Sequence, residues 1–112
     1  MRISDELTHA LAECIAATEF SMSKCLKLVN PGEVRDCIQA QWDCATICAS
    51  TLQLLSRGSK NAQALLEECI EICKECEELC NEVNLGHLKM CAETCRNCYM
   101  ICEQHIGFAR VA

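Results

Sequence analysis

The chain has 112 residues, including 13 cysteines, and its 16 acidic against 10 basic side chains give a formal net charge of −6. This length fits one domain spanning 1–112, and the acidic balance excludes nucleic acid as a partner because phosphate binding needs a basic surface. The sequence has no stretch of about 18 apolar residues, which excludes a membrane span. The N-terminal residues form no apolar signal region, so we expect a cytoplasmic protein, where such cysteine density indicates metal binding.

Helix-terminating residues divide the chain into four predicted helices with short connections. Ser4, followed by two acidic residues, predicts a helix start, and Asn30 with Pro31 predicts the cap and first turn of the next helix. Gly58 suits the position just after a helix end, and Gly107 is expected to end the last helix. The predicted helices span, in chain order, 4–29, 31–57, 61–84 and 87–106.

The cysteines recur at one interval within these helices. The third and fourth predicted helices carry cysteines at i, i+4, i+7 and i+11, and the first two carry the same pattern with gaps. Eleven residues make about three turns, so each set lies along one helix face. The sequence therefore predicts an all-α, antiparallel up-down-up-down four-helix bundle with a cysteine-lined core. The candidate metal ligands are Cys14, Cys25, Cys37, Cys44, Cys48, Cys69, Cys73, Cys76, Cys80, Cys91, Cys95, Cys98 and Cys102.

An antiparallel bundle arranges these inward positions as four flat layers. Three positions hold Thr18, Ser21 and Gln41 instead of cysteine, which makes the middle of the core poorer in sulfur; we call these three residues the waist. The predicted layers are Cys14, Cys48, Cys69 and Cys102; Thr18, Cys44, Cys73 and Cys98; Ser21, Gln41, Cys76 and Cys95; and Cys25, Cys37, Cys80 and Cys91. An apolar plug is predicted beyond the first layer, formed by Leu7, Leu11, Leu52, Leu55, Leu65 and Leu66.

Packing alone does not explain a thiol-lined core, because Leu or Ile would fill it with smaller voids. Sulfurs at i and i+4, as in Cys69 and Cys73, can share one ion at a separation of about 4.5 Å. That geometry suits a soft monovalent ion, and thiolates select Cu(I). If each thiolate bridges two ions, the core holds up to about one Cu(I) per cysteine and is neutral. The sequence thus predicts Cu(I) storage without catalysis, with copper least evenly bound at the waist.

Two other functions remain open at this point. A ferredoxin-like iron–sulfur electron carrier is one alternative, although its usual Cys-x2-Cys-x2-Cys-x3-Cys-Pro motif differs from the spacing here and no proline follows. A zinc-thiolate module is the other, because four thiolates bind one Zn²⁺ and 13 cysteines could hold about three such ions.

Three further residues are ancillary candidates. His87 and His105 fall outside the cysteine layers at opposite ends of the predicted bundle, where either can line an entrance for copper. Met22 lies beside the waist and can offer a thioether to copper. No histidine has a serine or carboxylate at a spacing typical of hydrolytic or transfer enzymes.

The Cys-x3-Cys-x2-Cys-x3-Cys runs at 69–80 and 91–102, together with the Cys44–Cys48 pair and the chain length, resemble the bacterial copper storage proteins. The likeness covers essentially the whole chain. It implies an antiparallel four-helix bundle, often a homotetramer, that stores Cu(I) on core cysteines. Without a secretion signal, the chain is similar to the cytosolic members, whose implied role is a detoxifying store. The first predicted helix departs from the family's dense pattern at Thr18 and Ser21.

Overall fold

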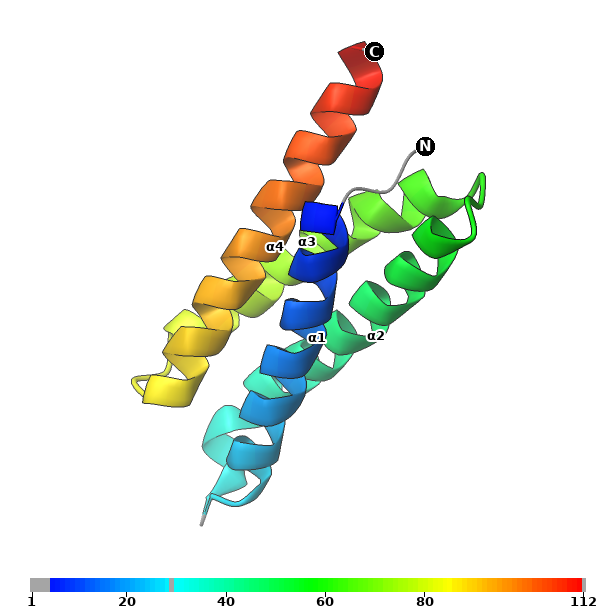
Figure 1. Cartoon of the computed structure of the whole chain (residues 1–112). Helices are drawn as coiled ribbons and strands as arrows, with labels where there is room; N and C mark the ends of the chain where they lie inside the picture. Colours follow the sequence, from blue (N-terminus) through cyan, green and yellow to red (C-terminus); the bar gives the residue numbers. More distant parts are fainter. Residues whose placement is uncertain (1–4, 29, 112) are drawn as a thin grey trace.

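The computed structural model describes residues 5–28 and 30–111, with only the backbone described for Pro31 and for residues 108–111. Within these ranges the chain forms four α-helices and no strand (Figure 1). The elements are α1 (Asp5–Leu26), the 3₁₀ turn η1 (Pro31–Val34), α2 (Arg35–Ser56), α3 (Ala62–Asn81) and α4 (Gly86–Val111).

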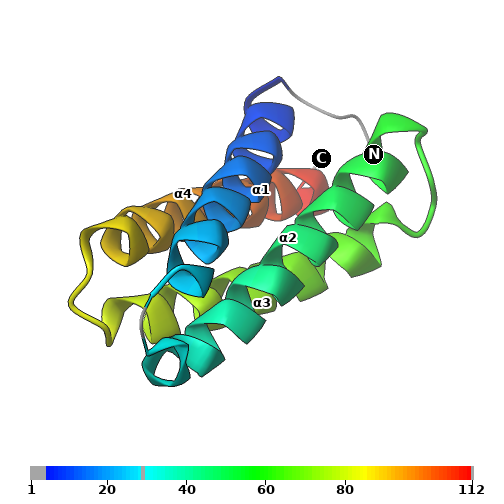
Figure 2. The same ribbon diagram turned by 90° about the horizontal axis from the view of Figure 1, so that it is seen from below.

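The helices run alternately in opposite directions, and each packs on its two neighbours around the bundle (Figure 2). Helix α1 therefore lies between α2 and α4, and its beginning is at the same end of the bundle as the end of α4 (Figure 1). The described chain measures 49 × 21 × 19 Å along its principal axes. The predicted all-α, antiparallel four-helix bundle is confirmed. Among the described helices, none is both long and apolar enough to cross a bilayer.

Helix ends follow the sequence signals in part. Gly58 has a left-handed φ of 65°, and its backbone N–H donates to the carbonyl of Leu55, so it ends α2 in the way that a glycine after a helix does. Asn30 precedes a helix as expected, but its side chain makes no capping hydrogen bond, and neither does that of Asn61 before α3. The Asn30 amide instead donates to the Glu33 carboxylate at 3.5 Å.

Four predicted boundaries differ from the structure by three residues or more. Helix α2 begins at Arg35 and not at residue 31, because the 3₁₀ turn η1 precedes it. Helix α1 ends at Leu26 and α3 at Asn81, each three residues before the predicted end, while α4 continues to Val111. Gly107 does not end α4, because it costs only about 1 kcal/mol relative to Ala inside a helix and is followed by the helix-favouring Ala109 and Arg110. The predicted boundary residues Ser4 and Val29 lie outside the described residues.

The core has a sulfur-lined middle and an apolar end. All 13 cysteines are buried, as are the three waist residues. Beyond Cys14 lie the buried side chains of Leu7, Leu11, Leu55 and Leu66, which form the apolar plug. Leu52 and Leu65, also predicted there, are half-buried at its edge. The plug seals the end of the bundle where α1 begins.

Candidate metal centre

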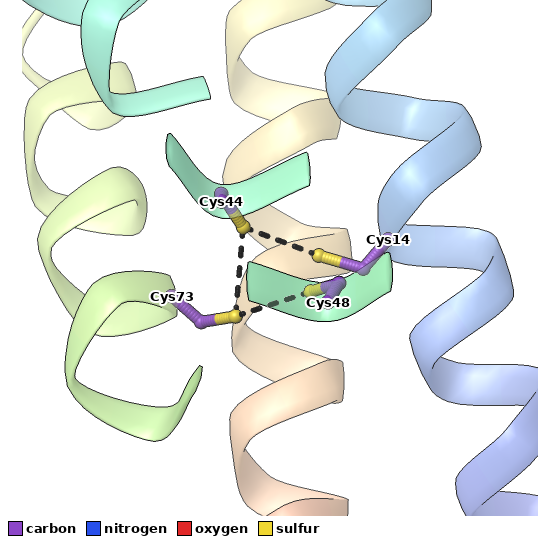
Figure 3. Close-up of side chains that lie close together, drawn as sticks. All are labelled: Cys14, Cys44, Cys48 and Cys73. Atoms are coloured by element: carbon purple, nitrogen blue, oxygen red, sulfur yellow. Dashed lines mark hydrogen bonds between the residues drawn. The ribbon is translucent and has the colours of Figure 1, made fainter. Parts of the chain in front are cut away.

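The thiols of different helices are in direct contact along the bundle axis. Cys44 from α2 is central to this arrangement: its Sγ lies 3.5 Å from that of Cys73, 3.6 Å from that of Cys14 and 4.0 Å from that of Cys95. Cys48 Sγ lies 3.9 Å from Cys73 Sγ, so four sulfurs from three helices face one another (Figure 3). None of the 13 cysteines forms a disulfide.

Ten of the cysteines belong to groups whose sulfurs all lie within 4.8 Å of one another. These groups share members, so they form one connected network rather than separate sites. Two groups contain four sulfurs and two contain three. They are Cys14, Cys44, Cys48 and Cys73; Cys48, Cys69, Cys73 and Cys98; Cys44, Cys76 and Cys95; and Cys76, Cys80 and Cys91.

The flat layers predicted from the sequence hold between α2 and α3, where the sulfurs of Cys44 and Cys73 lie 3.5 Å apart and those of Cys48 and Cys69 lie 3.7 Å apart. For α1 the predicted register is wrong. Cys14 was expected in one layer with Cys48, yet its sulfur contacts those of Cys44 and Cys95, which were placed one and two layers further along. At the other end, Cys25 contacts His87 at 3.5 Å, one turn beyond Cys91. Flat layers require parallel helix axes and cysteines at the same heights along the bundle in all four helices, whereas these helices cross at an angle (Figure 1). Helix α1 is therefore displaced by about one turn.

The waist is present, but it does not interrupt the sulfur network. The Thr18 hydroxyl donates to the carbonyl of Cys14 at 2.8 Å, which is a hydrogen bond within α1. The Ser21 hydroxyl and the Gln41 carbonyl oxygen are buried without a hydrogen-bond partner among the described residues. The group of Cys44, Cys76 and Cys95 bridges this region.

Cys25 and Cys37 stand apart from the network near the end of the bundle opposite the plug. Cys37 donates to the carbonyl of Leu79 at 3.3 Å, and Gln41 donates from its amide to Cys25 Sγ at 3.8 Å. Burial raises the pKa of both thiols, and the Gln41 amide partly opposes that rise at Cys25. The sequence pattern identified Gln41 only as a gap in the cysteine series. Residue spacing shows that its side chain faces inward, but it does not show which atoms the amide reaches.

Within the network, hydrogen bonds between thiols and burial shift the pKa of each sulfur. Hydrogen bonds with Cys14 and Cys44, followed by further thiols and desolvation, raise the pKa of Cys73. Hydrogen bonds with Cys44 and Cys80 likewise raise the pKa of Cys76. Hydrogen bonds with Cys14 and with Cys102 lower the pKa of Cys44 and of Cys98, respectively. The metal-free network therefore holds its protons unevenly, and metal binding must release those that remain.

The ancillary candidates occupy different surroundings. His87 is brought to Cys25 by the displacement of α1, with Nε2 at 3.5 Å from the sulfur. His105 lies at the plug end, where its Nε2 is buried without a hydrogen-bond partner in the described part of the chain. Met22 is half-buried in α1. Only His87 of the three is hydrogen-bonded to a thiol among the described residues.

This geometry matches known proteins. The profile of the family described as copper storage protein, Csp, matches residues 2–107. The Cu(I)-bound copper storage protein BsCsp3 superposes with a TM-score of 0.84 at 26% identity, covering 88% of this chain and 92% of that one. The apo form of copper storage protein 3 from Bacillus subtilis gives 0.83 at 25% identity, with 91% and 97% covered.

A comparison of sequences also finds a cysteine-rich relative. The cysteine-rich protein YhjQ of Bacillus subtilis strain 168 is 26% identical over 84 residues, which cover 75% of this chain and 78% of that protein. The family match spans nearly the whole bundle, including all 13 buried cysteines. The chain belongs to the copper storage protein family.

Proposed function

We propose that this protein stores many Cu(I) ions on the sulfur network, without catalysing a reaction. The observation that carries the proposal is the sharing of sulfurs between groups: Cys44, Cys48, Cys73 and Cys76 each belong to two of them. Shared thiolates are bridging ligands, and bridging suits Cu(I), a soft ion that accepts few ligands. The Cu(I)-bound relative with a TM-score of 0.84 supports the same cargo.

The same sharing disfavours the two alternatives. Both four-sulfur groups contain Cys48 and Cys73, so only one of them can close an isolated tetrahedral zinc site with four thiolates. An iron–sulfur cluster needs room for inorganic iron and sulfide between its cysteines. Cys44 Sγ already lies 3.5 Å from Cys73 Sγ, which leaves no such room.

Charge balance sets the capacity. Each Cu(I) that replaces one thiol proton leaves the charge of the core unchanged, so filling can proceed until there is about one ion per cysteine. A divalent ion held by four thiolates would instead leave a net negative charge buried in the core. We expect the waist to bind copper least evenly, because Ser21 and Gln41 offer no sulfur there.

Copper enters this core, in our proposal, at the end where Cys25 and His87 meet. The opposite end is closed by the buried leucines of the plug, among them Leu11 and Leu66. An imidazole 3.5 Å from a thiol offers a nitrogen and a sulfur together, a pair suited to receiving copper from a carrier. His105, beside the plug, has no such thiol partner in the described part of the chain. Met22 stays a prediction as a thioether donor.

We further propose a cytoplasmic homo-oligomer, a tetramer by family resemblance. Large apolar side chains on the outside support self-association: Phe20 is 61% exposed, Trp42 59% and Met90 69%. Light scattering of the metal-free protein measures the assembly, and a monomer mass would contradict it. Fractionation of the cells that make the protein measures the location.

Anaerobic titration with Cu(I) against a competing chelator tests the storage function. We expect binding to continue to about one equivalent per cysteine, with one proton released for each ion. Saturation at three or four equivalents would contradict bridging and favour a zinc-like stoichiometry. Iron and a brown colour in the purified protein would favour an iron–sulfur carrier. The variant Cys44→Ser tests the bridging role, because it removes a sulfur that two groups share. It should lower the capacity by at least one ion.

A further inference from the structure

One end of the sulfur network consists of groups of three, not four. Cys76, Cys80 and Cys91 form one such group, and Cys76 also joins Cys44 and Cys95 in another. In each group all sulfurs lie within 4.8 Å of one another, and all the members are buried. Cys76 Sγ and Cys80 Sγ lie 3.9 Å apart. Neither group has a fourth sulfur of the described residues within 4.8 Å of all its members, and three convergent thiols are an unusual donor set for divalent metals.

We propose that the metal-free core also binds trivalent arsenic, which takes three thiolates in a pyramid and keeps its lone pair on the open side. Arsenous acid, As(OH)₃, reacts with three thiols: three S–H and three As–O bonds break, three As–S bonds form and three waters leave. Arsenic remains trivalent, so no oxidant or reductant is required. The product carries no net charge, which suits a site without solvent.

The three-sulfur groups fit this centre better than they fit the ions already considered. A tetrahedral Zn²⁺ site needs four thiolates, and neither group supplies a fourth sulfur within 4.8 Å of all its members. Arsenic needs only the three sulfurs that the groups of Cys76 provide. The thiols of this region are also free and buried, so no disulfide must first be reduced. The inference rests on sulfur placement and holds whether or not copper is the natural cargo.

The shared sulfurs limit how many arsenic atoms can bind. Three groups of three can be chosen from the network without using any sulfur twice, and no fourth remains. One such choice is Cys76, Cys80 and Cys91; Cys48, Cys69 and Cys98; and Cys14, Cys44 and Cys73. The expected capacity is therefore about three arsenic atoms, against about one ion per cysteine for Cu(I).

Removing Cys76 destroys both three-sulfur groups at once and leaves only the two overlapping four-sulfur groups. Those can still supply two separate sets of three, so Cys76→Ser should bind about two arsenic atoms. Cys37→Ser is the matched control, because Cys37 is also buried, belongs to no group and is not part of the Cys25–His87 contact. This variant should still bind about three.

The experiment is an anaerobic titration of the copper-free protein and both variants with sodium arsenite, counted by native mass spectrometry. X-ray absorption at the arsenic edge then reports the neighbours, expected to be three sulfurs and no oxygen. Fewer than two atoms on the unaltered protein, equal capacity for Cys76→Ser and Cys37→Ser, or oxygen neighbours would each overturn the inference. Copper titration of the same samples separates the two proposals: normal copper uptake without arsenic binding refutes this one alone.

Discussion

Cys25 Sγ lies 3.5 Å from Nε2 of His87, although 62 positions separate the two residues in the chain. The contact joins α1 to the first turn of α4, at the end of the bundle that the leucine plug does not close. It exists because α1 is displaced along the bundle, which moves Cys25 past the level of Cys91. A nitrogen donor and a sulfur donor therefore meet before the main sulfur network begins.

Replacing this imidazole should slow copper uptake more than it lowers capacity. We expect His87→Ala to reduce the rate of Cu(I) transfer from a chelator several-fold and the capacity by at most one ion, because the network thiols remain. Stopped-flow absorbance of the chelator measures the rate. His105→Ala, at the plug end, is the control and should load normally. Equal rates for the two variants would refute an entrance at His87.

Copper should stabilise the fold strongly, since it binds the assembled thiol core more tightly than the unfolded chain. A ligand at 1,000 times its dissociation constant adds about 4 kcal/mol to the free energy of unfolding for one site, and this core offers many sites. Scanning calorimetry should show a melting temperature that rises with each copper added. Equal melting temperatures for the empty and filled protein would count against a copper-filled core.

The plug should supply much of the stability of the metal-free protein. Leu66 is fully buried, so Leu66→Ala should lower the free energy of unfolding by about 2–5 kcal/mol through lost burial and the cavity left behind. Urea denaturation measures the loss. Leu26→Ala is the matched control, because Leu26 is 62% exposed and should change stability by less than about 0.5 kcal/mol. Similar losses for both variants would show that the plug is not a packed core.

The copper-free protein should lose stability in alkali. Burial raises the pKa of Cys25 and of Cys37 in the folded state, so the fold keeps protons that the unfolded chain releases. The stability is fully present below about pH 8.5, the usual thiol value, and falls above it by about 1.4 kcal/mol per pH unit for each such thiol. Urea denaturation from pH 7 to 10 measures the slope, which Cys37→Ser should reduce. A flat profile would mean that the folded thiols ionise normally.

The buried Gln41 should be a stability cost in the absence of metal. Its carbonyl oxygen has no hydrogen-bond partner in the described structure, and an unpaired buried polar atom costs about 1–3 kcal/mol. Gln41→Leu should therefore raise the free energy of unfolding by about 1 kcal/mol, while Gln41→Glu, which adds a buried carboxylate, should lower it. Denaturant midpoints measure both. A loss with Gln41→Leu would mean that the hydrogen bonds from its amide to Cys25 Sγ and to the carbonyl of Cys37 outweigh the unpaired oxygen.

Residue spacing predicted which side chains face inward and how α2 and α3 align, but not how α1 aligns with the other helices. Cysteines eleven residues apart lie on one face of any helix, so the burial of Cys14 and Cys25 follows from spacing alone. The contact of Cys14 with Cys95 does not, because displacement along the axis depends on crossing angles and on how Leu11 packs in the plug. Similarly, glycine often ends a helix, yet Gly107 lies within α4. The cost of a glycine inside a helix is small enough for the helix-favouring residues around it to outweigh.

The leucine plug closes one end of the row of thiols, so the row can exchange ions only through its other end. If ions pass only the Cys25 end, those that arrive first are pushed towards Cys102 and those that arrive last stay near the opening. Release then follows the reverse order, so the ions bound last leave first. A partly filled protein would hold a quickly exchanging pool near the opening and a slowly exchanging one against the leucines, even if every thiolate bound copper with equal strength.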